Sequence, residues 1–220
     1  GDLQSAHCSQ SANGIVVAPH PVARGCTHEA VRIMAEAGEA AGMPPGLVSC
    51  MQAITLDGTQ ALMRHYAVSL ILATGGTPMV KAAHSVGKPA IGVGPGNVPV
   101  YVDRSADVPK AAADIVNSKA FDCSVICATE QSVVADKPIA AQLRAEMGKH
   151  GAYWVNAEQQ AALERALFSP DGSINPRSVG KTPQKLAQLA GITVPGWARV
   201  LVADLEGVGK DYPLSREKLT

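Results

Sequence analysis

The sequence predicts an α/β fold in which helices cover a parallel β-sheet. Short runs rich in β-branched residues, as in 14–19 and 68–76, alternate with longer segments of helical periodicity, as in 26–42. Most segments between these runs are short and contain glycine or proline, which end helices and strands. This alternation is typical of βαβ units, whose strands pair in parallel.

Each element of the first half follows from its local residues. The helix over 26–42 has Val31 and Ala35 on one face and is expected to end at Gly42. The other elements expected here are strands over 14–19, 46–52, 68–76 and 89–96 and helices over 56–66 and 78–87.

The second half begins after Asp103 with a helix over 106–121, which Ser105 or Asp107 is positioned to cap. The remaining elements expected are a strand over 130–136, helices over 138–151 and 157–168, a loop over 169–183, a helix over 183–192 and a strand over 198–207. No internal repeat is present to suggest a solenoid.

Composition excludes several classes of function. The chain has 19 Lys and Arg against 19 Asp and Glu, so its charge favours neither nucleic acid nor an anionic membrane as a partner. No apolar run reaches the roughly 18 residues of a membrane span, and residues 1–13 show no signal peptide. The five cysteines are odd in number and irregularly spaced, which predicts reduced thiols in a cytoplasmic protein.

Three glycine- or proline-rich turns follow predicted strands. The segments "APHP", "ATGGTP" and "GVGPGN" come at the carboxyl ends of strands, where α/β sheets bind ligands. Such turns offer free backbone N–H groups of the kind that bind a dinucleotide. Each is equally typical of an ordinary turn, and the G-x-G-x-x-G pattern does not occur.

Cys123 and Cys127 are four residues apart in "FDCSVICATEQ". A zinc site would need a second pair of ligands, and a thioredoxin-like pair would need the spacing Cys-x-x-Cys, so no metal is expected here. Two interpretations remain open on the residues alone. Both thiols are buried in the core, which periodicity favours, or one of them is a nucleophile.

A longer stretch around these cysteines, "SKAFDCSVICATEQSVV", resembles the nucleophile segment of the aldehyde dehydrogenase superfamily in its CoA-acylating form. The segments "VVAPHP", "AGMPPGLV", "LILATGGTPMVKAAHSVGKPAIGVGPGNVPVYVD" and "LAQLAGITVP" follow the order of that family. The resemblance covers 13–220 and is greatest to the dehydrogenase half of bifunctional aldehyde-alcohol dehydrogenases.

The resemblance implies an aldehyde dehydrogenase-like α/β fold. Residues 1–96 would form the second half of a Rossmann-like, parallel-sheet NAD-binding domain, and residues 97–220 the first part of an α/β catalytic domain. Cys127 falls on the nucleophile of the family. Cys123 falls where Asn is usual and Ser124 where Gly is usual, so a side chain constrains the turn that presents the thiol.

The cofactor contacts that the resemblance implies are for NAD. The alternative is that these residues have no contact with a cofactor: the glycines would only form turns, and Glu217 would be a solvated surface charge. The implied contacts are Ala18, Pro19 and His20 on the adenosine side, Thr74, Gly75 and Gly76 at the pyrophosphate, Val93 and Gly94 at the nicotinamide, and Glu217 at its ribose.

Val93 falls where hydrolytic relatives carry the glutamate that activates water. Because an apolar side chain cannot deprotonate water, a thioester on Cys127 should last until the thiol of CoA attacks it. The resemblance therefore implies reversible, NAD-dependent oxidation of a short aldehyde to acyl-CoA. A hydrolytic enzyme and a catalytically silent fragment or interaction module are the alternatives.

Members of the family are longer than this chain, which is therefore expected to be an internal fragment with little activity of its own. Glu217 would then lie on a frayed terminus. For the full-length protein the resemblance implies a homo-oligomer in the cytoplasm or in a bacterial metabolic compartment.

Overall fold

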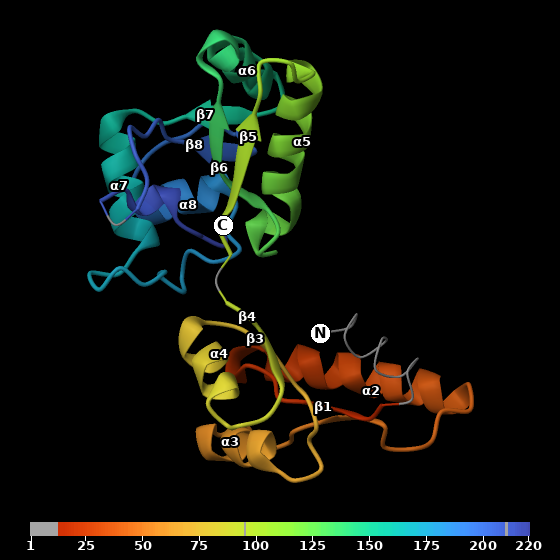
Figure 1. Ribbon diagram of the computed structural model, residues 1–220. Helices are drawn as coiled ribbons and strands as arrows, with labels where there is room; N and C mark the ends of the chain where they lie inside the picture. The colour runs from red at the N-terminus through yellow and green to blue at the C-terminus, as the bar shows by residue number, and fades with distance from the viewer. Residues whose placement is uncertain (1–12, 95, 210) are drawn as a thin grey trace. The chain divides into compact units, whose positions relative to one another are not determined.

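The computed structural model describes residues 13–94, 96–209 and 211–220 (Figure 1). The opening residues 1–12, for which no signal peptide is expected, lie outside the described residues. The chain divides into two compact units, one ending at Val93 and the other beginning at Gly94. The sequence prediction had put this boundary between residues 96 and 97.

The first unit consists of two parallel strand pairs with helices in their connections. Its elements are β1 (Ile15–Val17), a 3₁₀ turn (Pro21–Ala23), α2 (Arg24–Ala40), β2 (Val48–Cys50), α3 (Leu56–Arg64), β3 (Ile71–Thr74), α4 (Thr77–His84) and β4 (Ala90–Val93). β1 pairs with β2, and β3 pairs with β4, in two separate hydrogen-bonded ladders. The predicted α/β class is confirmed, with strand pairs in place of one continuous ladder.

Local sequence explains where the helices of this unit begin. The Thr55 side chain caps α3 by accepting the Gly58 N–H at 3.0 Å. Asp57 in the first turn and Arg64 in the last complement the helix dipole. A small core lies between α3, α4 and β3 and contains Met63, Ile71, Ala73 and Ala83.

The second unit repeats the arrangement on a larger scale. Its elements are β5 (Val98–Val102), α5 (Val108–Ala120), a 3₁₀ segment (Phe121–Ser124), β6 (Glu130–Ala135), α6 (Lys137–Lys149), β7 (Ala152–Trp154), α7 (Ala157–Leu167), α8 (Pro183–Ala190), β8 (Val200–Val202) and a 3₁₀ turn (Pro213–Ser215). β5 pairs with β6 and β7 with β8, again in parallel.

The sequence prediction missed two of these strands. β5 follows β4 so closely that the glycine-rich stretch between them obscures its start, and Pro99 argues locally against a strand. The pairing register shifts between Val98 and Pro99, which accommodates the missing N–H of the proline. β7 has three residues, too few for a periodic signal.

The capping prediction for α5 is confirmed for one of its two candidates. The Asp107 side chain accepts the Lys110 N–H at 3.1 Å, whereas Ser105 donates its hydroxyl to Asp103. Asp107 therefore fixes the start of the helix that leads into the cysteine segment.

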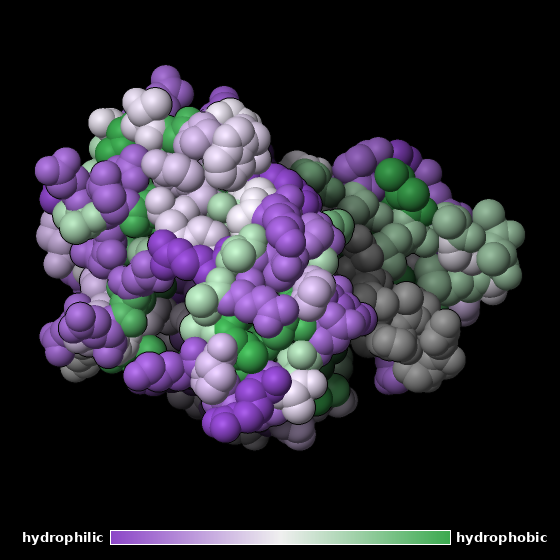
Figure 2. All heavy atoms as spheres, turned by 90° about the horizontal axis from the view of Figure 1, so that it is seen from above, coloured by the Kyte–Doolittle hydropathy of each residue, from purple (hydrophilic) through white to green (hydrophobic). Residues whose placement is uncertain are grey.

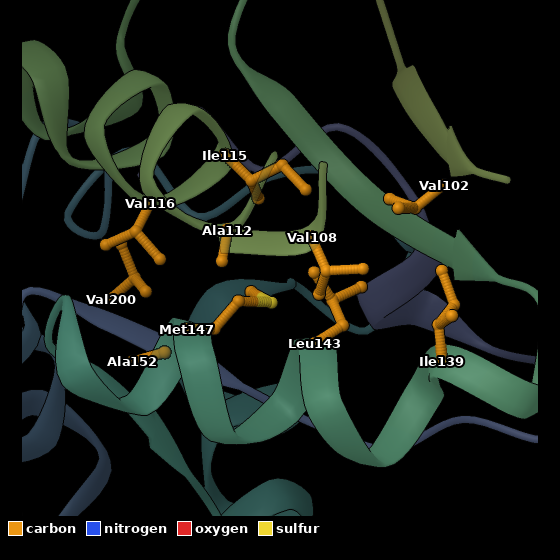
Figure 3. Close-up of a cluster of buried hydrophobic side chains, with 10 residues drawn as sticks. All are labelled: Val102, Val108, Ala112, Ile115, Val116, Ile139, Leu143, Met147, Ala152 and Val200. Atoms are coloured by element: carbon orange, nitrogen blue, oxygen red, sulfur yellow. The ribbon is translucent and has the colours of Figure 1, made fainter. Parts of the chain in front are cut away.

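The core of the second unit lies between α5 and α6. Figure 3 shows Val108, Ala112 and Ile115 of α5 facing Leu143 and Met147 of α6. Val116 of the same cluster has no exposed surface. Close packing of this kind makes the interior sensitive to loss of volume.

The surface is mixed in character. Figure 2 shows hydrophilic and hydrophobic residues interspersed over the face that it presents. In the part of the chain that the structure describes, no helix is long and apolar enough to cross a membrane. The four described cysteines, Cys26, Cys50, Cys123 and Cys127, are all free thiols.

The core predicts a large effect for truncation of Leu143, which is 3% exposed. Leu143→Ala should lower the free energy of unfolding by about 2–5 kcal/mol, because it removes buried methyl groups and leaves a cavity. Urea unfolding followed by tryptophan fluorescence measures this, since Trp154 and Trp197 both lie in the second unit. The control Leu189→Ala, at a 39% exposed side chain, should change stability far less. Equal losses in the two variants would contradict the assignment of the core.

Candidate active site

The amino ends of β5 and β6 bring the Cys127 turn against Gly96. The two strands are parallel and Val98 pairs with Glu130, so the residues that precede both strands lie at one end of the pair. A Cβ atom added to Gly96 would lie 3.0 Å from the Cys127 carbonyl oxygen. A side chain at position 96 would therefore crowd the Cys127 turn. The Cys127 side chain itself is exposed.

Glu217 joins the same end of the strand pair. Its carboxylate accepts the Gly96 N–H at 3.1 Å, and the Asn97 amide donates to the Ser215 carbonyl at 2.8 Å. The Ser132 hydroxyl donates to the same carbonyl at 3.3 Å. The expectation that Glu217 lies on a frayed terminus is wrong, because these bonds tie residues 215–217 to both strands.

A left-handed turn precedes the nucleophile position. Asp122, Cys123 and Ser124 have φ angles of 48°, 50° and 61°, a region that favours glycine. The sequence indicated that a side chain at Ser124 constrains this turn, and the φ angle of Ser124 agrees with that constraint. Each such residue costs of order 1–2 kcal/mol, so the turn needs compensating contacts.

The compensating contacts come from a buried polar cluster that the sequence did not reveal. The Ser124 side chain is fully buried and its Oγ accepts from the Lys119 ammonium at 2.9 Å. Ser124 Oγ also lies 2.7 Å from Thr129 Oγ1, and the Gln131 amide donates to it at 3.4 Å. Lys119 in the last turn of the helix that leads into the cysteine segment was the one available signal.

Two lysines, Lys119 of this cluster and Lys218 near it, are largely desolvated. Burial lowers the pKa of Lys119 to about 7, with repulsion from Lys218 adding to the shift and attraction to Glu130 opposing it. Burial also lowers the pKa of Lys218 to about 8. One carboxylate oxygen of Glu130 is buried with no hydrogen-bond partner in the described residues. The Lys218 ammonium donates to the carbonyls of Leu214, Arg216 and Gln131, at 2.6, 2.7 and 3.3 Å.

The two cysteines differ in their surroundings. Cys123 is partly buried and lines a cavity of about 950 Å³, together with Lys119, Glu130 and Lys218. Cys127 is exposed on the turn that Thr129 closes by donating its N–H to the Ile126 carbonyl at 3.1 Å. The interpretation of both thiols as buried core residues is therefore wrong for Cys127.

Four of the predicted cofactor contacts, Thr74, Gly75, Gly76 and Val93, lie together in the first unit. Thr74 pairs with Val93 at the carboxyl end of β3 and β4, and Gly75 donates its N–H to the Val93 carbonyl at 3.2 Å. Gly76 follows and precedes the first turn of α4. The Val93 side chain is 51% exposed and places no carboxylate at this position.

The other predicted contacts are spread over both units. Ala18 is exposed and Pro19 buried after β1, and His20 Nδ1 accepts the Val22 N–H at 3.3 Å, which caps the 3₁₀ turn. His20 therefore has a structural role whatever else it binds. Gly94 opens the second unit. Among the described residues no group of three or more His, Cys, Asp or Glu could hold a metal ion.

Comparison with known proteins identifies the family to which the chain belongs. The sequence profile of the aldehyde dehydrogenase family matches residues 6–161, which is most of the chain. A crystal structure of an acetylating aldehyde dehydrogenase from Geobacillus thermoglucosidasius superposes with a TM-score of 0.90 at 49% identity, over 94% of this chain and 46% of that one. The chain belongs to the aldehyde dehydrogenase family.

Two further relatives are similar over most of this chain, and one of them was solved with an acylated cysteine. An aldehyde-alcohol dehydrogenase of Streptococcus pneumoniae is 44% identical over 216 residues, which are 94% of this chain and 24% of that protein. A propionaldehyde dehydrogenase from Rhodopseudomonas palustris, solved with bound CoA and an acylated cysteine, superposes with a TM-score of 0.83 at 34% identity, over 92% of this chain and 46% of that one. The chain thus spans less than half the length of each relative.

The buried lysines predict how stability depends on pH. In the unfolded chain they keep their protons up to the ordinary pKa of 10.5, whereas in the folded chain they lose them near 7 and 8. The unfolded state therefore binds more protons above pH 7, and stability should rise with pH from there toward 10. Below pH 7 both states are protonated, and the cost of burying the charges is present in full.

Urea unfolding between pH 6 and pH 9.5 measures this slope. Each lysine that differs in protonation contributes up to about 1.4 kcal/mol per pH unit, so Lys119→Met and Lys218→Met should each flatten the rise. Lys185→Met, at an exposed lysine, is the matched control and should keep the parent slope. A slope in Lys119→Met equal to that of the parent would show that Lys119 stays solvated.

Proposed function

We propose that this chain is part of a CoA-acylating aldehyde dehydrogenase, which oxidises a short aldehyde to acyl-CoA with NAD and also runs in reverse. The observation that carries the proposal is the exposed thiol of Cys127 on a turn packed against Gly96, next to the Glu217 carboxylate. An exposed cysteine in a tightly positioned turn suits nucleophilic catalysis.

The chemistry assigned to the chain centres on Cys127. Its thiolate attacks the aldehyde carbon, and its own backbone N–H is one donor to the oxyanion that forms. When bound, NAD accepts the hydride that the adduct loses. The acyl group then stays on Cys127 as a thioester until the sulfur of CoA attacks the carbonyl, which frees the Cys127 thiol and releases acyl-CoA.

Acyl transfer in place of hydrolysis follows from Val93. An isopropyl side chain at this position has no basic atom, so it cannot take a proton from water beside the thioester. The thiol of CoA is a far better nucleophile than water. Acyl transfer is further supported by the R. palustris propionaldehyde dehydrogenase, a relative of similar fold that holds CoA together with an acylated cysteine.

The residues expected to hold NAD fit a dinucleotide. Thr74, Gly75 and Gly76 are exposed at the carboxyl end of β3, and the first turn of α4 follows them. Backbone N–H groups at a helix start attract phosphate. Ala18, Pro19 and His20 would contact the adenosine and Glu217 the nicotinamide ribose.

The remaining properties belong to the full-length protein. We expect it to form a homo-oligomer and to act in the cytoplasm or in a bacterial metabolic compartment. Its partners would be a small aldehyde or acyl-CoA.

The direct test measures NADH formation by the full-length protein with aldehyde, in the presence and absence of CoA. The proposal predicts sustained turnover only when CoA is present. Turnover without CoA would identify a hydrolytic enzyme. No turnover under either condition, in a folded protein, would support a silent interaction module.

The two cysteines should differ in acylation. Cys127→Ser should abolish the acyl adduct that forms when the full-length protein meets aldehyde and NAD, because Cys127 is the exposed one of the two thiols. Cys123→Ala should keep most of the adduct, since Cys123 faces the cavity. Peptide mass spectrometry locates the adduct. An acyl group on Cys123 would reverse the assignment.

Val93→Glu should create oxidation of aldehyde to free acid that needs no CoA. A carboxylate there supplies a base for water, and general-base catalysis is worth roughly 10²–10⁴-fold. Val93→Gln is the matched control, because glutamine has the size of glutamate but lacks its basic carboxylate. Release of free acid by the parent at the rate of Val93→Glu would show that Val93 does not decide between acyl transfer and hydrolysis.

A further inference from the structure

In the polar cluster beneath the cysteine turn, each hydroxyl group can donate only one hydrogen bond, and this decides which group donates and which accepts. The Thr129 hydroxyl donates to the Ile126 carbonyl at 3.0 Å, and a hydroxyl has one proton. In the 2.7 Å pair between Ser124 and Thr129, Ser124 must therefore be the donor. Ser124 Oγ is then left to accept, and Lys119 donates to it at 2.9 Å.

The resulting chain of hydrogen bonds runs from Lys119 through Ser124 and Thr129 to the Ile126 carbonyl. Ile126 is the residue before Cys127, so this carbonyl belongs to the peptide unit that carries the Cys127 N–H. The Thr129 N–H reaches the same oxygen at 3.1 Å. Donors on the carbonyl fix the plane of a peptide and strengthen its N–H as a donor.

The Lys119 side chain is itself held in place by further hydrogen bonds. Its ammonium donates a second hydrogen bond to the Gln131 side-chain oxygen at 2.9 Å, and the amide of Gln131 donates to Ser124 at 3.4 Å. The charged groups that act on it are Lys218, which repels it, and Glu130, which attracts it. Ser124 and Thr129 are buried, so water does not compete for these bonds.

We propose that Lys119 is a positioning residue, which acts through Ser124 and Thr129 to orient the peptide between Ile126 and Cys127. This orientation aims the Cys127 N–H at the oxyanion and fixes the thiol beside Gly96. The catalytic consequence rests on the proposed function of Cys127. The positioning of the turn does not depend on that function.

Ser124→Gly is the most informative variant. Glycine accepts the left-handed φ of 61° at position 124, so the backbone of the turn is retained while the chain of hydrogen bonds is cut. Lys119→Met cuts the same chain at its start. Lys185→Met removes an exposed charge and is the control.

Hydrogen–deuterium exchange of the turn is measured on the chain itself and needs no activity. Exchange over residues 125–129 should become about tenfold faster in Ser124→Gly and in Lys119→Met, the size expected for one hydrogen bond to a charged group. It should stay at the parent rate in Lys185→Met. Parent-like exchange in Ser124→Gly would overturn the proposal, because the hydroxyl would then be dispensable.

A double-mutant cycle separates positioning from general stability. If Lys119 acts through Thr129, Lys119→Met should slow thioester formation on Cys127 about tenfold in the parent, and at most twofold in a Thr129→Val background. Equal effects in both backgrounds would overturn the chain. Absence of any thioester in the parent would contradict the proposed function and leave the exchange result to decide the positioning.

Discussion

The parallel pairing of β5 with β6 is the constraint on which the rest of the second unit depends. Because Val98 and Glu130 are in register, the turn before each strand lies at the same end, and Cys127 comes against Gly96. α5 connects the two strands and packs on α6 through a cluster of buried apolar side chains (Figure 3). The Cys127 turn and Glu217 thus lie at the amino ends of a strand pair, whereas the other predicted NAD contacts follow the carboxyl ends of β1, β3 and β4.

The turn at Asp122–Ser124 shows how strain and burial combine. Three consecutive left-handed residues are unfavourable alone, and a partly desolvated lysine is also unfavourable. Placed together they offset one another, since Ser124 supplies an acceptor to Lys119 and Lys119 fixes the Ser124 side chain. Strained residues persist at functional sites where the surrounding structure fixes them.

Sequence reasoning predicted most helices of this fold, because their periodicity and caps are local. The assignment of Cys127 as nucleophile, through a segment that resembles a known family, stays a prediction. Sequence reasoning missed β5, because Pro99 is atypical of a strand although burial alternates along these residues. It also missed the contacts of Lys119, Gly96 and Lys218. The Gly96–Glu217 contact joins residues 121 positions apart, which no local pattern predicts. The contacts of Lys119 with Ser124 and of Lys218 with Leu214 span only five and four positions, and they depend on how those turns fold.

The central claim is that the amino end of the β5–β6 pair holds the Cys127 turn through Gly96. The rate at which acyl-CoA acylates Cys127 in full-length Gly96→Ala tests this, because the added Cβ would meet the Cys127 carbonyl oxygen at 3.0 Å. We predict a loss of about tenfold or more, since a misplacement of about 1 Å can cost about 10²-fold. Gly148→Ala, in α6 with no atom within 4 Å of the added Cβ, should acylate like the parent. Acylation of Gly96→Ala at the parent rate would contradict the account.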